Sequence, residues 1–274
     1  MEKFSVLMSL YSKENPKYLN SALDSLFTQT YQPTEVIMVF DGEVSSSLAS
    51  VVSSWKTKLN IIILELPNNV GLSSALNHGL EVCNYDLVAR FDTDDICLKN
   101  RFSEQVEFMA NNPSVDICGG FAKFIDSSGR EYSERRLPLE HSNIQRLIWS
   151  CPIIHPSVMF RKARIISIGS YNKEAPHRQD DYELWIRAMD SGLTFHNINS
   201  FLIQYRYNVD DFKKNTFRVG LYRFLIGFKP WWKYDKRASS FVGLLFPLLR
   251  ASLPLKLALG LTSFANRFDP RKKV

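Results

Sequence analysis

The sequence predicts an α/β fold in which a mostly parallel sheet carries helices on both faces, followed by a helical C-terminal tail. Short apolar runs typical of buried strands alternate with segments of helical periodicity, an order that builds parallel sheets. Residues 213–274 hold 14 of the 34 basic residues but only two of the 28 acidic ones, so this tail carries +12 and the first 212 residues carry −6. We therefore expect two parts, residues 1–212 and residues 213–274.

The composition excludes a disordered or collagen-like chain, because 45% of the 274 residues are hydrophobic and glycine and proline number only 12 each. The four cysteines, at positions 83, 97, 118 and 151, form no CxxC pair, so we expect reduced thiols and a cytosolic chain. Residues 1–16 contain one short apolar run and no cleavage-site pattern, which favours a strand over a signal peptide.

Five apolar runs are expected to form strands, because they are short, mostly rich in β-branched or aromatic residues, and bounded by polar turns. They are Phe4–Leu10, Glu35–Phe40, Asn60–Leu66, Tyr85–Phe91 and Val115–Gly119. Residues 120–212 have a less regular pattern, for which we expect an α+β arrangement.

Amphipathic segments between these runs predict the helices. Asn15-Pro16 forms a helix start ahead of apolar residues at positions 19, 23, 26 and 27, and Gln32-Pro33 closes that helix. Leucines at positions 72, 76 and 80 mark a second helix, and apolar residues at positions 102, 106 and 109 mark a third.

Polar clusters follow three of the expected strands, namely Tyr11–Glu14, Asp41-Gly42 and Asp92–Asp95. Ligands of open α/β sheets bind beyond the carboxyl ends of the strands, so we expect these clusters to converge. Asp41 could form a plain turn, or it could accept a hydrogen bond from a base or a ribose hydroxyl. Tyr11 could be a packed aromatic residue, or it could stack on a base.

The cluster Asp92–Asp95 predicts a metal site. Three carboxylates within four residues repel one another unless a cation or solvent screens them. Mg²⁺ and Mn²⁺ prefer such oxygen ligands, together with substrate phosphates. The alternatives are a solvated turn or a helix N-cap at Asp94 or Asp95.

A second acidic pair, Asp180 and Asp181, lies where Leu184, Trp185 and Ala188 predict the start of a helix. The pair could be an ordinary N-cap with an acidic first turn. It could also present a carboxylate, kept ionised by the helix dipole, that takes a proton from an acceptor hydroxyl.

Together these motifs resemble family 2 glycosyltransferases, which have the GT-A fold. The resemblance runs from Phe4 to Arg206. It rests on five segments in the family's order, namely residues 9–42, NNVGLSSALNHG at 68–79, ARFDTDD at 89–95, HPSVMFRK at 155–162 and GSYNKEAPHRQDDYELWIRA at 169–188.

The resemblance implies roles for individual residues. Asp181 would be the catalytic base, and Asp94 would bind Mn²⁺ or Mg²⁺. The residues implied to bind the nucleotide-sugar donor are Ser9, Tyr11, Glu14, Asp41, Asn69, Gly71, Asn77 and Asp92. The implied reaction is a direct displacement that inverts the anomeric carbon, with Asp181 deprotonating the acceptor hydroxyl and the metal stabilising the leaving diphosphate.

The chain departs from the family pattern at three places. Phe40 replaces an acid before Asp41, and Asp180 stands where glutamate is commoner. Asn208 stands where a histidine often follows the Tyr-Arg pair, so any metal or phosphate role of that histidine is absent or moved. His155 could contact the donor phosphate or the acceptor, although a packed, hydrogen-bonded histidine is the favoured interpretation.

The tail predicts contact with a membrane surface. A spanning helix needs about 20 apolar residues, and Phe241–Leu261 nearly reaches this length, but Arg250, Lys256 and two prolines interrupt it. A charge near the bilayer centre costs about 2.5–3.5 kcal/mol. We therefore expect interfacial helices with Trp231 and Trp232 at headgroup depth. The alternative is a helical subdomain packed on the body with a solvated basic face. Nucleic acid is not an expected partner, because the body is acidic.

The resemblance extends to bacterial enzymes of O-antigen, capsule and exopolysaccharide assembly. It implies UDP-Glc or UDP-Gal as donor, a lipid-linked acceptor such as GlcNAc-diphospho-undecaprenol, and a peripheral location on the cytoplasmic face of the inner membrane. One competing hypothesis is a catalytically silent, membrane-bound nucleotide-sugar binding or scaffold protein, which would need neither Asp94 nor Asp181. A sugar nucleotidyltransferase is another, but the loop after the first strand lacks the glycines that this chemistry usually shows.

Overall fold

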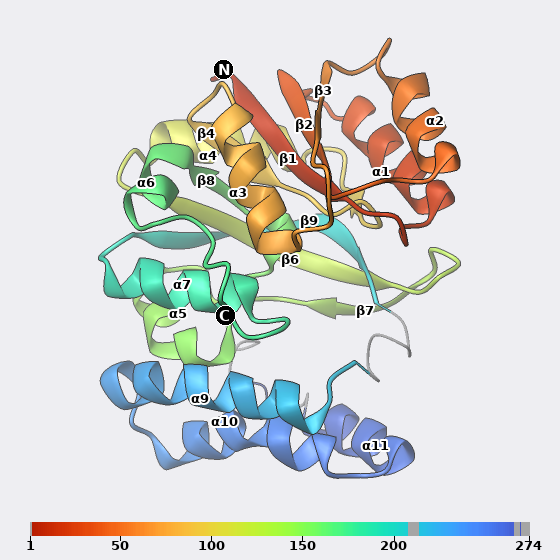
Figure 1. Ribbon diagram of the computed structural model, residues 1–274. Helices are drawn as coiled ribbons and strands as arrows, with labels where there is room; N and C mark the ends of the chain where they lie inside the picture. The colour runs from red at the N-terminus through yellow and green to blue at the C-terminus, as the bar shows by residue number, and fades with distance from the viewer. Residues whose placement is uncertain (1, 208–213, 266–268, 270–274) are drawn as a thin grey trace.

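The computed structural model describes residues 2–207, 214–265 and 269, and its centre is one mixed sheet of nine strands. Eight strands follow the order β3-β2-β1-β4-β8-β6-β9-β5, and β7 pairs with β6 (Figure 1). Helices cover both faces of the sheet, and three C-terminal helices lie against one end of the body.

The first four strands of the sheet are parallel, as the sequence predicts. They are β1 (Phe4–Leu10), β2 (Glu35–Phe40), β3 (Ile61–Glu65) and β4 (Leu87–Arg90). Leu10 pairs with Phe40, and Leu7 pairs with Arg90. The carboxyl ends of β1, β2 and β4 therefore meet at one edge of the sheet.

The second half of the sheet also contains antiparallel pairs, but the long pairing of β6 with β9 is parallel, so most of the paired residues of the sheet lie in parallel pairs, as the sequence predicts. The short strand β8 (Met159–Arg161) runs antiparallel to both β4 and β6 (Ile117–Ile125). β9 (Phe195–Arg206) is parallel to β6. β5 (Ile96–Cys97) pairs with β9, and β7 (Glu131–Arg135) pairs with β6, both in antiparallel orientation. Antiparallel pairs need no helical crossover, so the β-α alternation of the first half does not continue here.

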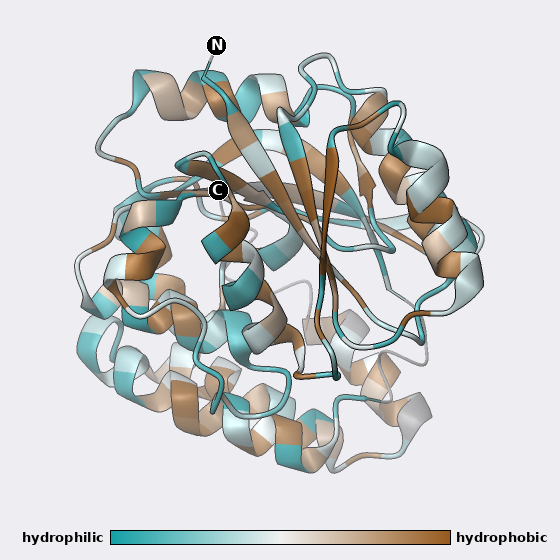
Figure 2. Ribbon diagram, turned by 45° about the horizontal axis from the view of Figure 1, so that its top comes forward, coloured by the Kyte–Doolittle hydropathy of each residue, from teal (hydrophilic) through white to brown (hydrophobic). Residues whose placement is uncertain are grey.

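Side chains alternate between the two faces of each parallel strand. Val6 and Met8 belong to the hydrophobic core between the sheet and a first layer of helices. Leu7 belongs to the core between the sheet and a second layer on the other face. The first layer is α1 (Pro16–Phe27), α2 (Ser46–Trp55) and α4 (Arg101–Asn111). The second is α3 (Leu72–Val82), α5 (His141–Leu147), α6 (Lys162–Ser167) and α7 (Asp180–Asp190). Figure 2 shows largely hydrophobic strands enclosed by helices of mixed hydropathy.

The start of α1 confirms the predicted cap, because Asn15 Oδ1 accepts a hydrogen bond from the backbone N–H of Lys17 at 2.9 Å. The helix ends at Phe27, before the expected Gln32-Pro33 stop. All four cysteines are free thiols, as expected.

The tail forms three helices, α9 (Phe217–Tyr234), α10 (Ala238–Ala251) and α11 (Leu255–Ala265). The expected boundary at residue 212 lies outside the described residues. Among those described, no helix is both long enough and apolar enough to cross a bilayer. Pro254 separates α10 from α11, whereas Pro247 lies within α10.

The tail is packed on the body, as in the alternative interpretation. Trp231 and Leu244 form a buried cluster with Leu147 and Trp149, the latter belonging to the 3₁₀ helix η1 (Ile148–Ser150). The Trp149 Nε1–H group donates to Asp235 Oδ2 at 2.8 Å. Trp231 is only 8% exposed, so its expected place at headgroup depth is wrong, whereas Trp232 is 60% exposed.

The contact between α9 and the body depends on Gly227. A Cβ atom there would collide with the Tyr182 hydroxyl and lie 3.0 Å from the Trp149 carbonyl oxygen, both of the body, and 2.7 Å from Leu244 Cδ1 of α10. We therefore expect Gly227→Ala to lower the free energy of unfolding by about 1–3 kcal/mol through overpacking. Thermal unfolding of the full chain measures the effect.

Gly260→Ala in α11 is the matched control, because nothing lies within 4 Å of a Cβ atom at that position. It should leave stability unchanged or raise it by up to about 1 kcal/mol through helix propensity. Equal melting temperatures for the two alanine variants would contradict the packing described here.

Candidate active site

Three polar segments meet at the carboxyl edge of the parallel strands, as the sequence predicts. Tyr11–Glu14 follows β1, Asp41-Gly42 follows β2, and the acidic loop, which we define as Asp92–Asp95, follows β4. Glu14 reaches the acidic loop, where it shares a side-chain hydrogen bond with Thr93.

The acidic loop brings three carboxylates together. One oxygen from each of Asp92, Asp94 and Asp95 lies within 4.8 Å of the others. The alternative of a helix N-cap at Asp94 or Asp95 is wrong, because α4 begins only at Arg101. The carboxylates therefore face one another rather than a helix terminus.

Burial and mutual repulsion raise the pKa values of the carboxyl groups of Glu14, Asp94 and Asp95. Burial, together with the charge of Asp92, raises the pKa of Asp94 to about 6. Burial and the charges of Asp94 and Asp92 raise the pKa of Glu14 to about 7. The pKa of Asp95 is also raised well above its ordinary value, mainly by burial.

A divalent cation fits this donor set. The three oxygens are hard ligands at a spacing that one ion can bridge. Asp95 Oδ2 is buried and has no hydrogen-bond partner among the described residues, which is unusual for a carboxylate oxygen. These residues therefore have the composition and the unsatisfied charge that Mg²⁺ or Mn²⁺ would complement.

Two arginines that sequence reasoning did not assign to the site hold the acidic loop. Arg90 is 1% exposed and pairs with Asp92, while its Nε and Nη1 groups have no partner in the described part of the chain. Arg206, at the end of β9, donates from Nε to the Asp94 carbonyl oxygen at 2.8 Å and from its backbone N–H to Asp95 Oδ1 at 2.8 Å.

Arg206 is itself fixed from two further sides. Its Nη1 group donates to the Asp126 carbonyl oxygen at 2.7 Å, and its guanidinium lies 4.1 Å from the centre of the Tyr18 ring. Arg206 belongs to the Tyr205-Arg206 pair at the end of the region that resembles the family. This position is the only feature of the sequence that could have indicated a role for Arg206 in the site.

The Asp41 carboxylate accepts hydrogen bonds from three consecutive residues of the loop before α3. Its Oδ1 accepts from the backbone N–H of Val70 at 2.6 Å, and its Oδ2 accepts from Asn69 Nδ2 at 3.0 Å and from Gly71 N–H at 3.1 Å. Gly42 must be glycine, because it has φ +81° and a Cβ atom would lie 2.7 Å from the Asn69 nitrogen. The structure thus brings Asp41, Asn69 and Gly71 together, with the carboxylate holding the loop.

Asn77 is used in a different way from the one expected. Its side chain donates to the Tyr171 carbonyl oxygen at 2.8 Å and accepts from the Tyr171 N–H at 2.9 Å. The amide therefore ties α3 to the segment before α7, and a direct contact with a nucleotide stays a prediction. Ser9 is partly exposed at the end of β1, and Tyr11 beyond it is 39% exposed.

The acidic pair lies at the start of α7, and its two members have different surroundings. Asp180 Oδ1 accepts a hydrogen bond from Ser73 Oγ at 2.5 Å. Asp181 is partly exposed and accepts from backbone N–H groups at the helix start. Burial raises the pKa of Asp181, while the positive charge of Arg223 from α9 lowers it. Asp181 is thus the member without a side-chain tether to α3.

The phenol groups of Tyr171 and Tyr205 interact electrostatically with both Asp181 and the acidic loop. Burial raises the pKa of Tyr171, and the negative charges of Asp181 and Asp92 raise it further. Burial also raises the pKa of Tyr205, with further contributions from the acidic loop and from Asp181. Because such interactions fall off with distance, both phenols lie near the acidic loop and near the start of α7.

His155 is packed, as the favoured interpretation expects. It lies in the 3₁₀ helix η2 (His155–Ser157), is 8% exposed, and has Nε2 2.8 Å from the Tyr171 hydroxyl. Burial holds its pKa well below the ordinary value, so the ring is neutral and supports Tyr171.

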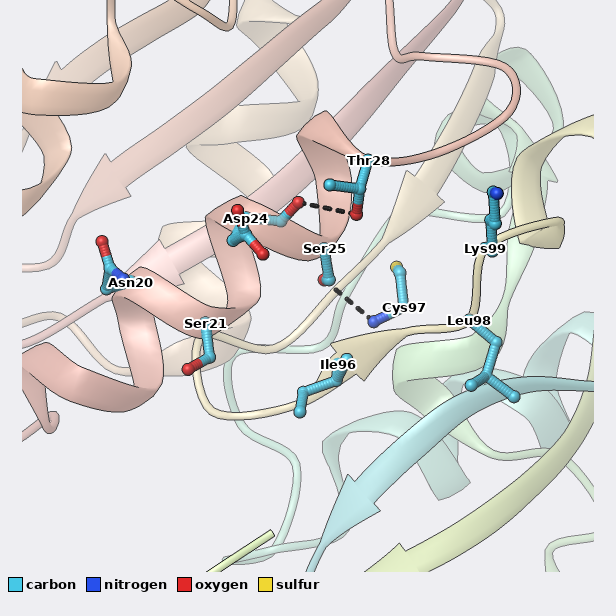
Figure 3. A pocket seen from close by; sticks show the side chains of 9 residues that line it. All are labelled: Asn20, Ser21, Asp24, Ser25, Thr28, Ile96, Cys97, Leu98 and Lys99. Atoms are coloured by element: carbon cyan, nitrogen blue, oxygen red, sulfur yellow. Dashed lines mark hydrogen bonds between the residues drawn. The ribbon is translucent and has the colours of Figure 1, made fainter.

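An open groove lies between α1 and residues 96–99, which directly follow the acidic loop in the sequence (Figure 3). Ser25 Oγ accepts from the Cys97 N–H at 3.0 Å, and Thr28 Oγ1 donates to the Asp24 carbonyl oxygen at 3.0 Å. Both hydroxyls are therefore hydrogen-bonded to backbone groups. The bond between Ser25 and Cys97 holds the segment that follows the acidic loop against α1.

Solved structures share this architecture. TarS 1–349 of S. aureus in complex with UDP-GlcNAc matches with a TM-score of 0.63 and 16% identity, covering 92% of this chain and 82% of that one. The mannosyltransferase PcManGT of Pyrobaculum calidifontis, in complex with GDP-Man and Mn²⁺, matches with a TM-score of 0.62 and 15% identity, covering 97% of this chain and 74% of that one. At these identities the likeness establishes the fold, which is of the GT-A type.

Sequence relatives carry the comparison further. The family model "Glycosyl transferase family 2" matches residues 5–168. The amylovoran biosynthesis glycosyltransferase AmsE of Erwinia amylovora is 40% identical over 233 residues, which cover 82% of this chain and 86% of that protein. A UDP-Gal:alpha-D-GlcNAc-diphosphoundecaprenol beta-1,3-galactosyltransferase of Escherichia coli is 38% identical over 213 residues, or 77% of each chain. These matches show that the chain belongs to glycosyltransferase family 2.

Proposed function

We propose that the protein transfers a hexose from UDP-Gal or UDP-Glc to a hydroxyl of a lipid-linked saccharide, with inversion, during assembly of an O-antigen or a related surface polysaccharide. The observation that carries the proposal is the convergence of the acidic loop and Asp181 around Tyr171 and Tyr205. The relative that acts on GlcNAc-diphosphoundecaprenol supports the choice of donor and acceptor.

The acidic loop would hold the donor diphosphate through a divalent ion. Asp92, Asp94 and Asp95 are the residues that would bind this ion. Arg90 pairs with the Asp92 carboxylate, and the backbone N–H of Arg206 donates to the Asp95 carboxylate. When bound, Mg²⁺ or Mn²⁺ would neutralise negative charge on the diphosphate. Ser9, Tyr11, Glu14 and the unit of Asp41, Asn69 and Gly71 would border the nucleoside.

Asp181 would accept the proton of the acceptor hydroxyl. Its carboxylate belongs to the first turn of α7, is partly accessible, and lies near Tyr171 and Tyr205, as does the acidic loop. Holding the two substrates in this arrangement lowers the entropic part of the barrier. A silent binding protein would need the donor pocket but not a carboxylate at this place, so the geometry favours the enzyme.

The assignment of the base is tested by replacing each member of the acidic pair. Asp181→Asn should lower kcat about 10²–10⁴-fold, the usual contribution of a general base. Asp180→Asn is the matched control and should lose far less, because an asparagine oxygen can still accept from Ser73 Oγ. UDP release in the presence of the lipid-linked acceptor measures both.

The pH profile gives a second readout of the same experiment. Asp181 must be ionised to accept a proton. Burial raises its pKa, the positive charge of Arg223 lowers it, and the negative charge of Asp180 raises it further. The wild-type rate should therefore fall on acidification at a higher pH than an ordinary aspartate would give. Equal losses in Asp180→Asn and Asp181→Asn would remove Asp181 from this role.

We also propose that residues 213–274 attach the protein to the membrane surface. Five apolar residues of α9 that are 37–60% exposed recur at spacings of three and four residues, namely Phe217, Leu221, Leu225, Phe228 and Trp232. Lys229 and Lys233 lie on the same helix with exposed side chains, and both pair with Asp190 of α7. The exposed apolar row itself is what suits a lipid interface.

The membrane proposal predicts that Leu225→Asn combined with Trp232→Asn weakens binding to vesicles of phosphatidylethanolamine and phosphatidylglycerol about tenfold or more, because two exposed apolar side chains are lost. Ile166→Asn is the control, since Ile166 is 47% exposed but lies on α6. Vesicle co-sedimentation measures binding, and undiminished binding of the double variant would contradict the proposal.

A further inference from the structure

α3 is seated directly on the parallel strands. Gly79 lies so close to the sheet that a Cβ atom there would collide with the Leu7 side chain of β1 and lie 2.8 Å from Val39 Cγ2 of β2. The Asp41 carboxylate binds the loop that precedes the helix. Because a close-packed interior resists small displacements, α3 is a fixed reference for the segments that it contacts.

α3 contacts the chain around the proposed base at two places, one helical turn apart. Ser73 is 5% exposed, and its Oγ donates to Asp180 Oδ1 at 2.5 Å. Asn77 follows on the same face of the helix. Its side chain donates to the Tyr171 carbonyl oxygen at 2.8 Å and accepts from the Tyr171 N–H at 2.9 Å. Residues 171–180 are therefore tethered to one helix at both of their ends.

The start of α7 lacks the usual side-chain cap. Its N-cap residue, Gln179, makes no side-chain cap hydrogen bond. Arg178, directly before it, has φ +63°, a left-handed conformation that costs a residue other than glycine about 1–2 kcal/mol. Such a conformation persists only where surrounding contacts hold it. The hydrogen bond from Ser73 to Asp180 supplies a contact of this kind from outside the helix.

From these contacts we infer that Ser73 is a positioning residue for the proposed base. The inference rests on the proposed function, because it takes Asp181 as the group that accepts the proton. The hydrogen bond between Ser73 and Asp180 fixes the first turn of α7 against α3, and Asp181 is the next residue of that turn. α3 thereby sets the base relative to the loop that Asp41 holds at the start of the same helix.

The chemistry of the tether suits a positioning role. A hydroxyl that donates to a carboxylate forms a charge-assisted hydrogen bond, which is about twice as strong as a neutral one. A displacement of about 1 Å at a reacting group can cost about 10²-fold in rate. Asp180 therefore serves the reaction by holding its neighbour in place, and loss of the tether should affect kcat rather than binding of the nucleotide sugar.

The test measures kcat and KM of full-length variants with the nucleotide sugar that the wild type uses and with the lipid-linked acceptor. Ser73→Ala and Asp180→Ala should each lower kcat about 10- to 100-fold and leave KM for the nucleotide sugar unchanged. The double variant should lose no more than the more affected single variant, because both changes remove the same hydrogen bond. Asp180→Asn keeps an acceptor for Ser73 Oγ and should retain far more activity than Asp180→Ala.

A second measurement shows whether Ser73 acts through the base. In an Asp181→Asn background, Ser73→Ala should cause no further loss of kcat, since no carboxylate remains to be positioned. Ser74→Ala is the matched control, because it removes the next hydroxyl of α3, which bonds to none of the residues that the structure describes. It should behave like its parent in both backgrounds. A Ser73→Ala loss that is equally large in both backgrounds would overturn the inference.

The same variants separate this inference from the proposed function. If Asp181→Asn transfers sugar at the wild-type rate, the proposed base is wrong and the inference is overturned with it. If Asp181→Asn is impaired but Ser73→Ala is not, the proposed function stands and the inference alone fails. A loss in Ser73→Ala that requires Asp181 supports both.

Discussion

The repulsion among three aspartates at the end of β4 is the constraint on which the site depends. At the largest separation of 4.8 Å, two unit charges repel by about 3.5 kcal/mol in a medium of effective dielectric near 20. Arg90 pairs with Asp92 from the buried strand, and Arg206 holds Asp94 and Asp95 from β9. The fold thus stabilises a concentration of negative charge without neutralising it, which leaves the loop ready for a divalent ion.

The tail is part of this arrangement rather than a separate appendage. Trp149 of the body packs with Trp231 and Leu244 of the tail. Burial raises the pKa of Asp181, and the charge of Arg223 of α9 offsets part of this effect. The face of α9 that contacts the body therefore lies beside the proposed base, while the row of exposed apolar residues on the same helix is the part that we propose for the membrane. One helix can in this way connect the place where a lipid-linked acceptor resides with the carboxylate that would activate it.

Local patterns predicted the parallel half of the sheet well. Phe4–Leu10 and Glu35–Phe40 are strands with the expected bounds, because buried apolar runs next to polar turns have few alternatives. The helix Ser46–Trp55 was missed, since its serine-rich start masks the apolar face. The roles of Arg90 and Arg206 could not be predicted, because their partners meet them only through the sheet. Trp231 was misplaced for the same reason: its partners Leu147 and Trp149 lie far away in the sequence.

The most direct test of the account is thermal unfolding of the wild type and Asp94→Asn at pH 7.5, with and without MnCl₂. The ionised Asp94 has a raised pKa in the folded protein, so it destabilises the fold above that pKa and a neutral side chain should relieve the repulsion. Metal-free Asp94→Asn should melt higher than the wild type, by about 2–4 °C for each kcal/mol relieved. Mn²⁺ should raise the melting temperature of the wild type and of the exposed control Asp24→Asn, but not that of Asp94→Asn. An equal Mn²⁺ shift in all three proteins would contradict the account.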